Sequence, residues 1–590
     1  MATTAVPFHV CLVPSVPKFP DRQKTALRRS RTGRIWCKSP TNGKEDENQT
    51  RRRELLLGLG GVYGASALSS DPFANAAPIL APDFAKCKNA TVVPFPGSNQ
   101  QPLVLDCCPP VPEKIIDFTP RVDRQPLKVR PAAHLASREY IAKYDKALKL
   151  MRNLPASDPR SFAQQAKVHC AYCDGAYVQV GFPTKTLQVH NSWLFFPYHR
   201  WYLYFYERIL GKLIGDPNFA IPYWNWDNPG GMAIPSMFVN PSSSLYDTLR
   251  EKTHQPPVLM DLDYNGKDGD VSAEEQVPHN LAIMYRQMVT QGKTPQLFFG
   301  DPYRAGDDPY TLGTGLGSIE NTPHTAVHRW VGDKSQPFGE NMGNFYSAGR
   351  DPLFYCHHAN IDRMWTIWQS ELGGARRVSV PDPDWLESSF LFYDENANAV
   401  RVKVKDCLNT RLLGYEYQLV DLPWLSAKPT PRRGPKVADV FGDRGKVARA
   451  AVNVVPLSSF PVVLDKEVSA MVERPKKSRS KKEKTEEEEV LIIEGIEYDP
   501  TVAVKFDVYI NEDEGIYGGP ATTEFGGSFV NVPHLHSEGM MMKSKMKIGL
   551  TDLLDDLGVD GDEKVLVSLV PQLNTEKIKI ESMKISLVRD

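Results

Sequence analysis

The chain has 590 residues, of which 41% are hydrophobic and 24% charged, and its formal net charge is −1. This composition excludes a wholly disordered protein, and the length favours three or four domains of about 150 residues each. The balanced charge excludes a general attraction to nucleic acid or to an anionic membrane. Nine cysteines are too few for a disulfide scaffold, although five of them fall between residues 87 and 173.

The first 44 residues contain nine lysines and arginines, many serines and threonines, and a single acid, Asp21. Abundant arginine and serine with scarce acids is typical of an organelle transit peptide. Three arginines at 51–53, an apolar run at 55–69 and an Ala-Asn-Ala site at 74–76 then resemble a twin-arginine export signal.

The apolar run is too short to span a membrane, which takes about 20 residues. We therefore predict that residues 1–76 are a chloroplast transit peptide followed by a thylakoid signal, cleaved before Ala77. The mature protein is expected in the thylakoid lumen with no stable membrane insertion. In that oxidising compartment the early cysteines can pair, and four cysteines allow three connectivities that spacing alone does not distinguish.

Residues 77–130 are rich in proline and valine, which predicts an extended strap pinned by disulfides. Helical patterns dominate from Ser137 to about Arg376. Helices are expected over Pro197–Leu210, from Thr322-Pro323 onward, and from Asp351-Pro352 onward, because proline suits the first turn and Thr or Asp suits the N-cap. The intervening stretch 228–310 is predicted to be rich in loops.

Beyond Arg376 the pattern changes to short alternating segments. Residues 427–454 are basic and rich in proline, as in an exposed linker. Period-two runs then predict strands at 462–464, 490–493, 502–510 and 565–569, and hence an all-β sandwich. The charged block 476–489 within it is expected to be a solvated loop that does not bind nucleic acid.

An EF-hand-like pattern at Asp261, Asp263, Asn265 and Gly266 is expected not to bind calcium. Its twelfth position is Ser272, where an EF-hand uses a bidentate glutamate, and no flanking helix is evident from the sequence.

Nine of the 13 histidines lie between residues 169 and 358. His324 and His328 are spaced i, i+4, so a helix would project both imidazoles from one face. A single histidine is more often a core or surface residue, but several on facing helices within aromatic sequence are not explained that way. Imidazole-only ligation suits copper, zinc or nickel, and two clusters of three predict a metal pair, for which dicopper with O₂ is the leading interpretation.

Four segments now give the chain a specific resemblance: HCAYCDGAY (169–177), HNSWLFFPYHRWYLYFYERILG (190–211), HTAVHRWVG (324–332) and DPLFYCHHANIDRMWTIW (351–368). They resemble the two copper-binding regions of plant polyphenol oxidases, the catechol oxidases of the tyrosinase family, which have type-3 copper centres. Asp384-Trp385-Leu386 resembles the DWL region of that family, and Lys505–Val508 resembles its KFDV domain. The resemblance covers essentially the whole chain.

The resemblance implies that His169, His190 and His199 hold the first copper and that His324, His328 and His358 hold the second. Neighbours on a helix point about 100° apart, so His357 is expected to have a supporting or structural role. Cys173 matches the cysteine that forms a thioether with the second histidine, here His190, although a plain buried thiol is the alternative. The implied disulfides are Cys87–Cys108 and Cys107–Cys170, which leaves Cys356 and Cys407 free.

Other implied roles concern the surroundings of the metals. Glu320 and Asn321 match a pair that holds a water near copper, where the carboxylate could take a phenol proton; the alternative for Glu320 is an acid at a helix start. Phe345 matches the bulky residue over one copper, with an ordinary core phenylalanine as the alternative. Thr325 and Arg329 are expected to line the mouth of the site. Tyr415 and Tyr417 match a structural tyrosine pair.

The predicted fold class is α+β: a mainly helical catalytic domain with a central four-helix bundle holding the dicopper site, followed by an all-β sandwich. The predicted domains are a tyrosinase-like domain at 77–376, a DWL closure at 377–426, a linker at 427–454 and a KFDV domain at 455–590. The sequence leaves the oligomeric state open.

The predicted function is the oxidation of o-diphenols to o-quinones with reduction of O₂ to water by two copper ions per chain, with o-hydroxylation of monophenols left open. The partners are O₂ and small phenols. A hemocyanin-like reversible O₂ carrier is the alternative, and a zinc hydrolase is disfavoured because neither motif has a carboxylate base. The β domain is expected to cover the copper mouth and keep the enzyme latent until the linker is cut.

Overall fold

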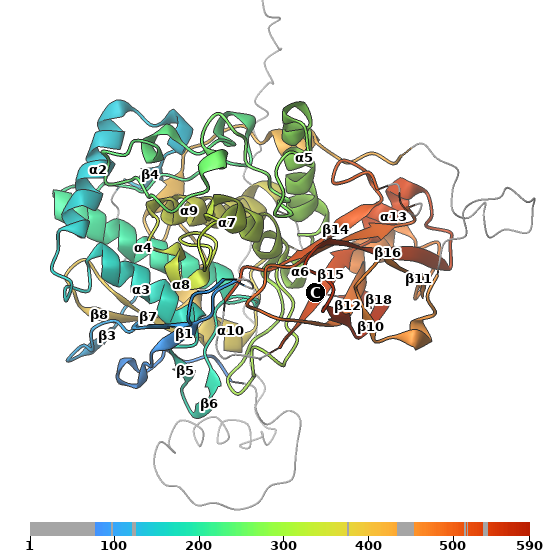
Figure 1. Ribbon diagram of the computed structural model, residues 1–590, viewed down its shortest axis with the longest axis horizontal. Helices are drawn as coiled ribbons and strands as arrows, with labels where there is room; N and C mark the ends of the chain where they lie inside the picture. Colours follow the sequence, from blue (N-terminus) through green and yellow to red (C-terminus); the bar gives the residue numbers. More distant parts are fainter. Residues whose placement is uncertain are drawn as a thin grey trace, which may run out of the picture. The chain divides into compact units, whose positions relative to one another are not determined.

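The computed structural model describes residues 77–95, 98–120, 126–373, 377–432, 454–512, 515, 517–534 and 541–589. The described residues all belong to one compact unit, Pro72–Asp590. The predicted targeting segment 1–76 lies outside the described residues, and so do residues 433–453 of the predicted linker. Figure 1 shows the helices and the C-terminal strands of this unit as two groups.

The described part of the chain begins with a strap of short strands, as predicted for residues 77–130. Strand β1 pairs with β2 in antiparallel fashion, while β3 and β4 pair in parallel with β8 and β9, which come nearly 300 residues later. Two disulfides, Cys87–Cys108 and Cys107–Cys170, attach this strap to itself and to helix α3. The strands are β1 (Ala90–Val92), β2 (Leu103–Leu105), β3 (Ile115–Asp117), β4 (Lys128–Arg130), β8 (Ala399–Lys403) and β9 (Tyr415–Tyr417).

The helical part forms because capped, largely apolar segments bury most of their length. Helix α4 begins at Phe195, two residues before the predicted Pro197, and ends where Gly215 adopts φ 69°. Asp351 is the N-cap of α9 as predicted, since its carboxylate accepts the Leu353 N–H. The longer α-helices are α2 (Arg138–Arg152), α3 (Phe162–Cys173), α4 (Phe195–Ile214), α5 (Ala273–Tyr285), α7 (Thr325–Val331) and α9 (Pro352–Ile367). Shorter ones are α6 (Pro295–Phe299), α8 (Phe345–Ala348) and α10 (Pro383–Glu387).

A buried ionic cluster centred on Asp362 joins the helices to the segment after residue 377. Arg200 Nε donates to one Asp362 oxygen at 2.5 Å and Arg130 Nη1 to the other at 3.2 Å. The hydroxyls of Tyr415 and Tyr417 also donate to Asp362, at 2.6 and 2.5 Å. These charges pull the pKa of Asp362 below its ordinary value despite burial, and the tyrosine pair has the structural position that its sequence match implied.

The stretch 228–310 is less irregular than expected, because it contains helix α5. Ser272 is its N-cap and accepts the Glu275 N–H. The prediction that no helix flanks the EF-hand-like pattern was therefore wrong, because α5 follows it. The pattern has another role: Asp263 accepts from Lys505 Nζ at 3.1 Å and from the Ser528 hydroxyl at 2.8 Å, both in the C-terminal part.

The C-terminal part consists of two antiparallel sheets with a hydrophobic core of their own. One sheet has the order β10-β17-β12-β15 with β18 also paired to β12, and the other has the order β11-β16-β13-β14. The strands are β10 (Val462–Val463), β11 (Val468–Glu473), β12 (Glu488–Tyr498), β13 (Lys505–Ile510), β14 (Phe525–Val530), β15 (Met542–Gly549), β16 (Lys564–Leu573), β17 (Lys579–Ile580) and β18 (Ser582–Val588). Two short helices, α12 (Lys481–Glu486) and α13 (Thr551–Leu557), make this part less purely β than predicted.

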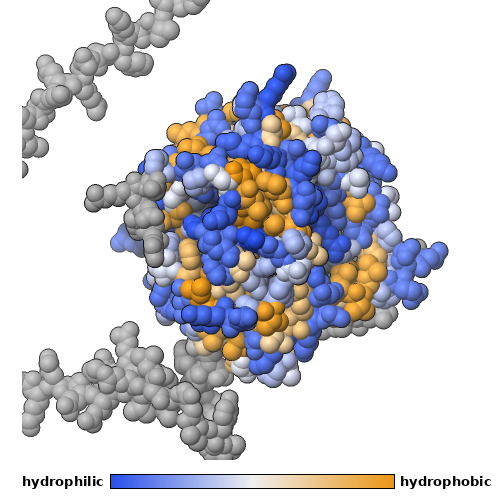
Figure 2. Space-filling model, turned by 90° about the vertical axis from the view of Figure 1, so that its left-hand side faces the viewer, coloured by the Kyte–Doolittle hydropathy of each residue, from blue (hydrophilic) through white to orange (hydrophobic). Residues whose placement is uncertain are grey.

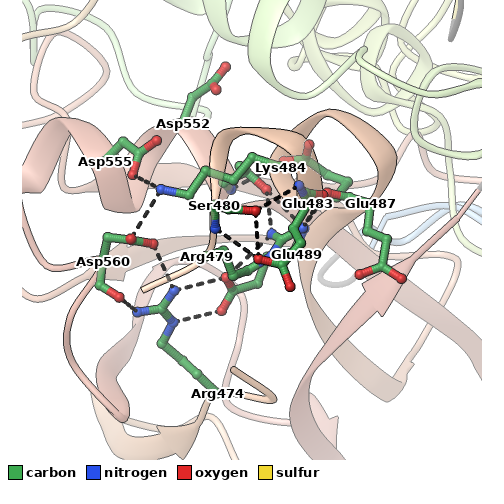
Figure 3. A network of polar contacts seen from close by, with 12 residues as sticks. Arg474, Arg479, Ser480, Glu483, Lys484, Glu487, Glu489, Asp552, Asp555 and Asp560 are labelled. Carbon is green, nitrogen blue, oxygen red and sulfur yellow. Dashed lines mark hydrogen bonds and ion pairs between the residues drawn. The ribbon is translucent and has the colours of Figure 1, made fainter. Parts of the chain in front are cut away.

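The charged block 476–489 is not the solvated loop that its composition suggested. Ser480 and Glu483 form a capping box that begins α12, and Glu489 is only 1% exposed on β12. Arg474 pairs with Glu489 through Nε at 2.7 Å and Nη2 at 3.0 Å, while Lys484 pairs with Asp555 and Asp560, as Figure 3 shows. Charges of this block are therefore neutralised in the fold by partners outside it as well as within it, as in the pair Lys476–Glu483.

The surface carries both hydrophobic and hydrophilic side chains, as expected from the mixed composition of the chain. On the face in Figure 2, hydrophobic patches are interrupted by hydrophilic side chains. Among the described residues, no helix has the length and apolar character needed to cross a membrane.

Candidate metal centre

Six histidines converge in the helical part, from four helices, one loop and one turn. His169 lies on α3, His199 on α4, His328 on α7 and His358 on α9. His190 lies in the loop after β6 (Phe182–Thr186), and His324 ends the distorted turn Glu320–His324 before α7. Each of the six is at most 3% exposed.

The six rings form two trios that meet. Ring centroids are 5.1–5.7 Å apart within His169, His190 and His199. They are 4.6–5.4 Å apart within His324, His328 and His358. The trios are joined where the His199 and His358 rings stack at 4.1 Å. The structure thus brings together all six predicted ligands in two adjacent groups.

Backbone carbonyls fix the tautomer of four of these rings. The Nδ1 atoms of His169, His199 and His328 lie 2.8 Å from the carbonyls of Phe345, Phe195 and Met342, and that of His324 lies 3.1 Å from the Glu320 carbonyl. A carbonyl only accepts, so Nδ1 must carry the proton and Nε2 must carry a lone pair.

The resulting lone pairs lack hydrogen-bond partners. Within the described part of the chain, the Nε2 atoms of His169, His199 and His324 have none, and neither ring nitrogen of His190 has one. His328 Nε2 faces His358 Nε2 at 3.2 Å. Unpartnered buried nitrogens are costly unless something binds them, and a metal ion bound by neutral imidazoles satisfies this donor set.

Burial keeps these imidazoles neutral. It lowers the pKa of His169 to about 3 and that of His328 to about 4, and lowers those of the other four well below the ordinary value. Neutral imidazole is the form that binds metals, so the site does not have to lose protons near neutral pH before it can be loaded.

His357 differs from its neighbour His358 in its tautomer. Its Nδ1 accepts the indole N–H of Trp226 at 3.1 Å. Indole only donates, so the neutral His357 ring carries its proton on Nε2 and presents a donor to the second trio. Its ligand atom lies within 4.8 Å of those of the second trio, so distance alone does not exclude His357, whereas its hydrogen bond argues against ligation.

Cys173 lies in the first group. Its sulfur and the ligand nitrogens of His169 and His190 are all within 4.8 Å of one another. In this structure Cys173 is a free, buried thiol, as are Cys356 and Cys407, and burial raises the pKa of Cys173 well above its ordinary value.

A small cavity of about 10 Å³ adjoins the trios, with room for about one water molecule. Glu320, Thr325 and Phe345 line it together with His190 and His324. The Phe345 ring stacks on that of His190 at a centroid distance of 4.1 Å. Arg329 is not part of the lining, in contrast to the prediction, and its guanidinium lies against Gly266.

Glu320 faces the metal centre, whereas Asn321 faces away from it. Glu320 accepts the Asn191 N–H at 2.6 Å, and burial raises its pKa well above the ordinary value. The Asn321 amide donates to the Ser528 carbonyl at 2.5 Å and accepts the Val530 N–H at 3.3 Å. Asn321, which was expected to hold a water together with Glu320, is therefore hydrogen-bonded to β14 instead.

The C-terminal part supplies the other wall of the cavity. Tyr498 and residues Val530–Val532 line it, and the His534 ring lies 4.9 Å from the Phe345 ring. Sequence reasoning missed these residues. A lone histidine or valine between strands carries no signal of a distant site, and only a prediction of how the two parts dock could have identified them.

Comparisons with known proteins agree with this geometry. Residues 159–371 match the common central domain of tyrosinase, 379–430 the polyphenol oxidase middle domain, and 460–587 the chloroplastic polyphenol oxidase C-terminal domain. The chain is 54% identical to a chloroplastic polyphenol oxidase of Malus domestica, over 94% of this chain and 93% of that one. It is 50% identical to aureusidin synthase of Antirrhinum majus, over 93% of this chain and 97% of that one.

Among solved structures, the fold matches a latent apple tyrosinase with a TM-score of 0.75 and 56% identity, over 80% of this chain and all of that one. The protein therefore belongs to the tyrosinase family of copper oxidoreductases, within its plant polyphenol oxidase branch. The cofactor is accordingly a binuclear copper centre, as in that family, and the chain has buried histidine clusters suited to a metal ion.

Proposed function

We propose that this protein oxidises o-diphenols to o-quinones and reduces O₂ to water. The observation that carries the proposal is the pair of adjacent, buried, neutral histidine trios, in which four Nε2 atoms have no hydrogen-bond partner among the described residues. Two diphenols lose four electrons and four protons for each O₂ that becomes two waters.

In the proposed ligand set, His169, His190 and His199 hold one copper, and His324, His328 and His358 hold the other. His357 is a positioning residue, because the Trp226 indole fixes its lone pair away from the metals. Cys173 is close enough to His190 to form the thioether implied by the family resemblance, and that bond would fix the orientation of the His190 ring.

The bound copper pair supplies electron transfer between the phenol and O₂. The surrounding chain orients the substrate and moves protons. The Phe345 ring over His190 offers a flat face to an aromatic substrate. Glu320, held by the Asn191 N–H, is the nearest carboxyl group to the cavity and can exchange a proton with a phenol once solvent enters and its pKa falls.

The closed cavity explains why the chain would be made as a latent precursor. A space for about one water does not admit a phenol, and residues 530–534 of the C-terminal part form the closing wall. Cutting the predicted linker 427–454 and displacing that wall would open the site. The domain limits that go with this proposal are 77–376, 377–426 and 455–590, with the copper-bearing helices as a four-helix bundle and the C-terminal sheets as a sandwich.

The names of the relatives bear on location and on the exact reaction. The Malus relative is named chloroplastic, which supports delivery of this chain to the chloroplast, and the predicted signal at 51–76 supports the thylakoid lumen. The Antirrhinum relative is named aureusidin synthase, so aurone formation from a phenolic precursor is the second candidate reaction.

Oxygen consumption tests the proposal. The chain 77–590, cut in its linker and loaded with copper, is expected to consume O₂ rapidly with 4-methylcatechol and to form the quinone. Stable O₂ binding without turnover would instead support an O₂ carrier, and two zinc ions without copper would support a hydrolase. Parallel assays with tyramine and with a chalcone distinguish a catechol oxidase from a hydroxylase or an aurone-forming enzyme.

A further inference from the structure

A second cavity, separate from the first, lies beside α3 and α8. Its volume is about 420 Å³, large enough for a small organic molecule. It is formed by α3, by the end of α2, by the end of β2 and by the segment that follows Phe345 on α8. None of the six histidines lines it.

The charge of this cavity is unbalanced. Arg152, Lys167 and Arg350 line it, and the only acid in the lining is Asp106. Lys167 Nζ pairs with Asp106 at 2.7 Å, which neutralises one cation. For Arg350, the described residues provide neither an ion pair nor a hydrogen bond to its guanidinium, which lies over the ring of Tyr346. The cavity therefore has an excess of two positive charges.

Both arginines are held over aromatic rings. The guanidinium carbon of Arg152 lies 4.1 Å from the Phe162 centroid, and that of Arg350 lies 5.0 Å from the Tyr346 centroid. Phe162 and Tyr346 are themselves buried, at 5% and 3% exposure. A guanidinium placed over a ring keeps its outer face free for stacking. Arg152 Nε also donates to the Ser244 carbonyl at 3.1 Å, which holds that side chain in place. The two arginines are thus positioned before any ligand arrives.

We propose that this cavity is a binding site for a small aromatic monoanion, such as an aryl carboxylate or aryl sulfonate. The anionic group would bind to Arg350, because a guanidinium without an ion-pair partner forms charge-assisted hydrogen bonds with such oxygens. The aryl ring would lie against the apolar wall of Leu105 and Ala163, or stack on the guanidinium of Arg152. A neutral phenol lacks the charge that this cavity selects, so the site differs in ligand class from the copper centre.

The cavity shares its walls with the copper centre. Lys167 and His169 belong to the same helix, and Tyr346 follows Phe345, whose carbonyl fixes the His169 ring. Helices α3 and α8 also approach closely, since a Cβ on Gly349 would come within 3.1 Å of the Ala166 Cα. A ligand in the cavity would therefore contact both elements that position His169, without entering the site of phenol oxidation.

Calorimetric titration of the copper-loaded chain 77–590 with benzenesulfonate tests this proposal. Benzenesulfonamide is the matched neutral probe, because it keeps the ring and tetrahedral sulfur but is uncharged at pH 7. We expect benzenesulfonate to bind with a dissociation constant of about 1 mM or tighter, and the sulfonamide to bind at least about tenfold more weakly. Raising the salt concentration should weaken benzenesulfonate binding alone.

Two variants locate the site. Arg350→Gln is expected to weaken benzenesulfonate binding about tenfold, because it removes the cation without an ion-pair partner while leaving the fold intact. Arg411→Gln removes an exposed arginine that pairs with Glu416 on another part of the surface, and it should leave the affinity unchanged. The proposal is overturned if wild type shows no binding up to about 10 mM, if both probes bind equally, or if Arg350→Gln binds as wild type does.

Discussion

Within the helical part and within the C-terminal part, apolar contacts form a core, whereas polar contacts are prominent between the two parts. The helical part has one large hydrophobic core, with the histidine trios and the Asp362 cluster buried inside it. The C-terminal sheets have a second core of their own. Where the two parts meet, polar contacts are prominent: Lys505 with Asp263, Asn321 with Ser528, and Lys293 with Asp552.

This difference shows how one chain can contain a complete set of metal ligands while substrate access to them stays blocked. A polar interface resembles those between separable proteins, whereas a shared apolar core would make the two parts inseparable. The C-terminal part adds only Tyr509, Phe525 and Val532 to the fully buried core of the helical part, so displacing it would expose a small share of that core. The copper ligands depend on the helical part alone, and access to them depends on the interface.

The largest expected effect comes from changing a ligand in the helical part. His358→Asn should bind one copper fewer per chain and lose at least about 100-fold in kcat, because one trio is left incomplete. Copper content and O₂ uptake with 4-methylcatechol, both after linker cleavage, are the measurements.

Two other histidines provide the controls for that variant. His357→Asn should keep two copper ions, since its tautomer directs a proton toward the second trio. His534→Asn, in the C-terminal part, should also keep both and should affect only the uncut chain. Loss of copper from His357→Asn with full copper in His358→Asn would reverse the ligand assignment.

A smaller but still large effect is expected at the charged contact between the parts. Lys505→Met leaves Asp263 and Asp507 facing each other without their cation, which costs about 3 kcal/mol and opens the interface. The activity of the uncut chain, expressed as a fraction of that of the cut chain, should rise more than tenfold. Lys543→Met is the control, because its ammonium is exposed and pairs only loosely with Glu581, at 3.8 Å. An unchanged fraction in Lys505→Met would mean that this contact does not hold the site closed.

The same contact predicts a dependence on pH. Burial, opposed by Lys505 and reinforced by Asp507, raises the pKa of Asp263 from 3.8 to about 7. Above about pH 4, Asp263 is deprotonated when the two parts are separated but stays protonated when they are docked. The free energy that this protonation contributes to docking is therefore complete below about pH 4, decreases as the pH rises, and is lost above about pH 7.

One proton changes the ratio of open to closed chains by at most about tenfold per pH unit. The activity of uncut chain divided by that of cut chain should thus rise from pH 5 to pH 7 and level off above, and the ratio cancels the pH dependence of the chemistry. Asp263→Asn should flatten the profile. A profile of equal slope in that variant would assign the dependence to another group.

The smallest effect is expected at Asn321. Asn321→Ala removes two hydrogen bonds to β14, worth about 1 kcal/mol each, and should raise the activity of the uncut chain several-fold. In the cut chain the same variant should be neutral or less active, because Asn321 is then free to bind water beside Glu320. A variant that has no effect on the uncut chain would show that β14 is held by other contacts.

Much of the helical site could be predicted from local sequence. The i, i+4 spacing of His324 and His328, the N-cap at Asp351 and the aromatic run around His199 each specify structure within a few residues, and long motifs carried the family resemblance. The start of α4 and the presence of α5 were misjudged, because proline and loop-forming residues are tolerated where tertiary packing buries the neighbouring turns. The charged block 476–489 was misjudged for a similar reason, since composition does not show that Arg474 neutralises Glu489.

By itself, the sequence determined the class of chemistry, the helices that carry the histidines and the order of the parts, because these depend on residue types at short spacings. Only the tertiary structure decided which nitrogen of each ring is free, that His357 and His358 differ, that Asn321 is bound to β14, and that residues 530–534 close the site. Each of these depends on a carbonyl, an indole or a strand brought from far along the chain, and no local pattern records such partners.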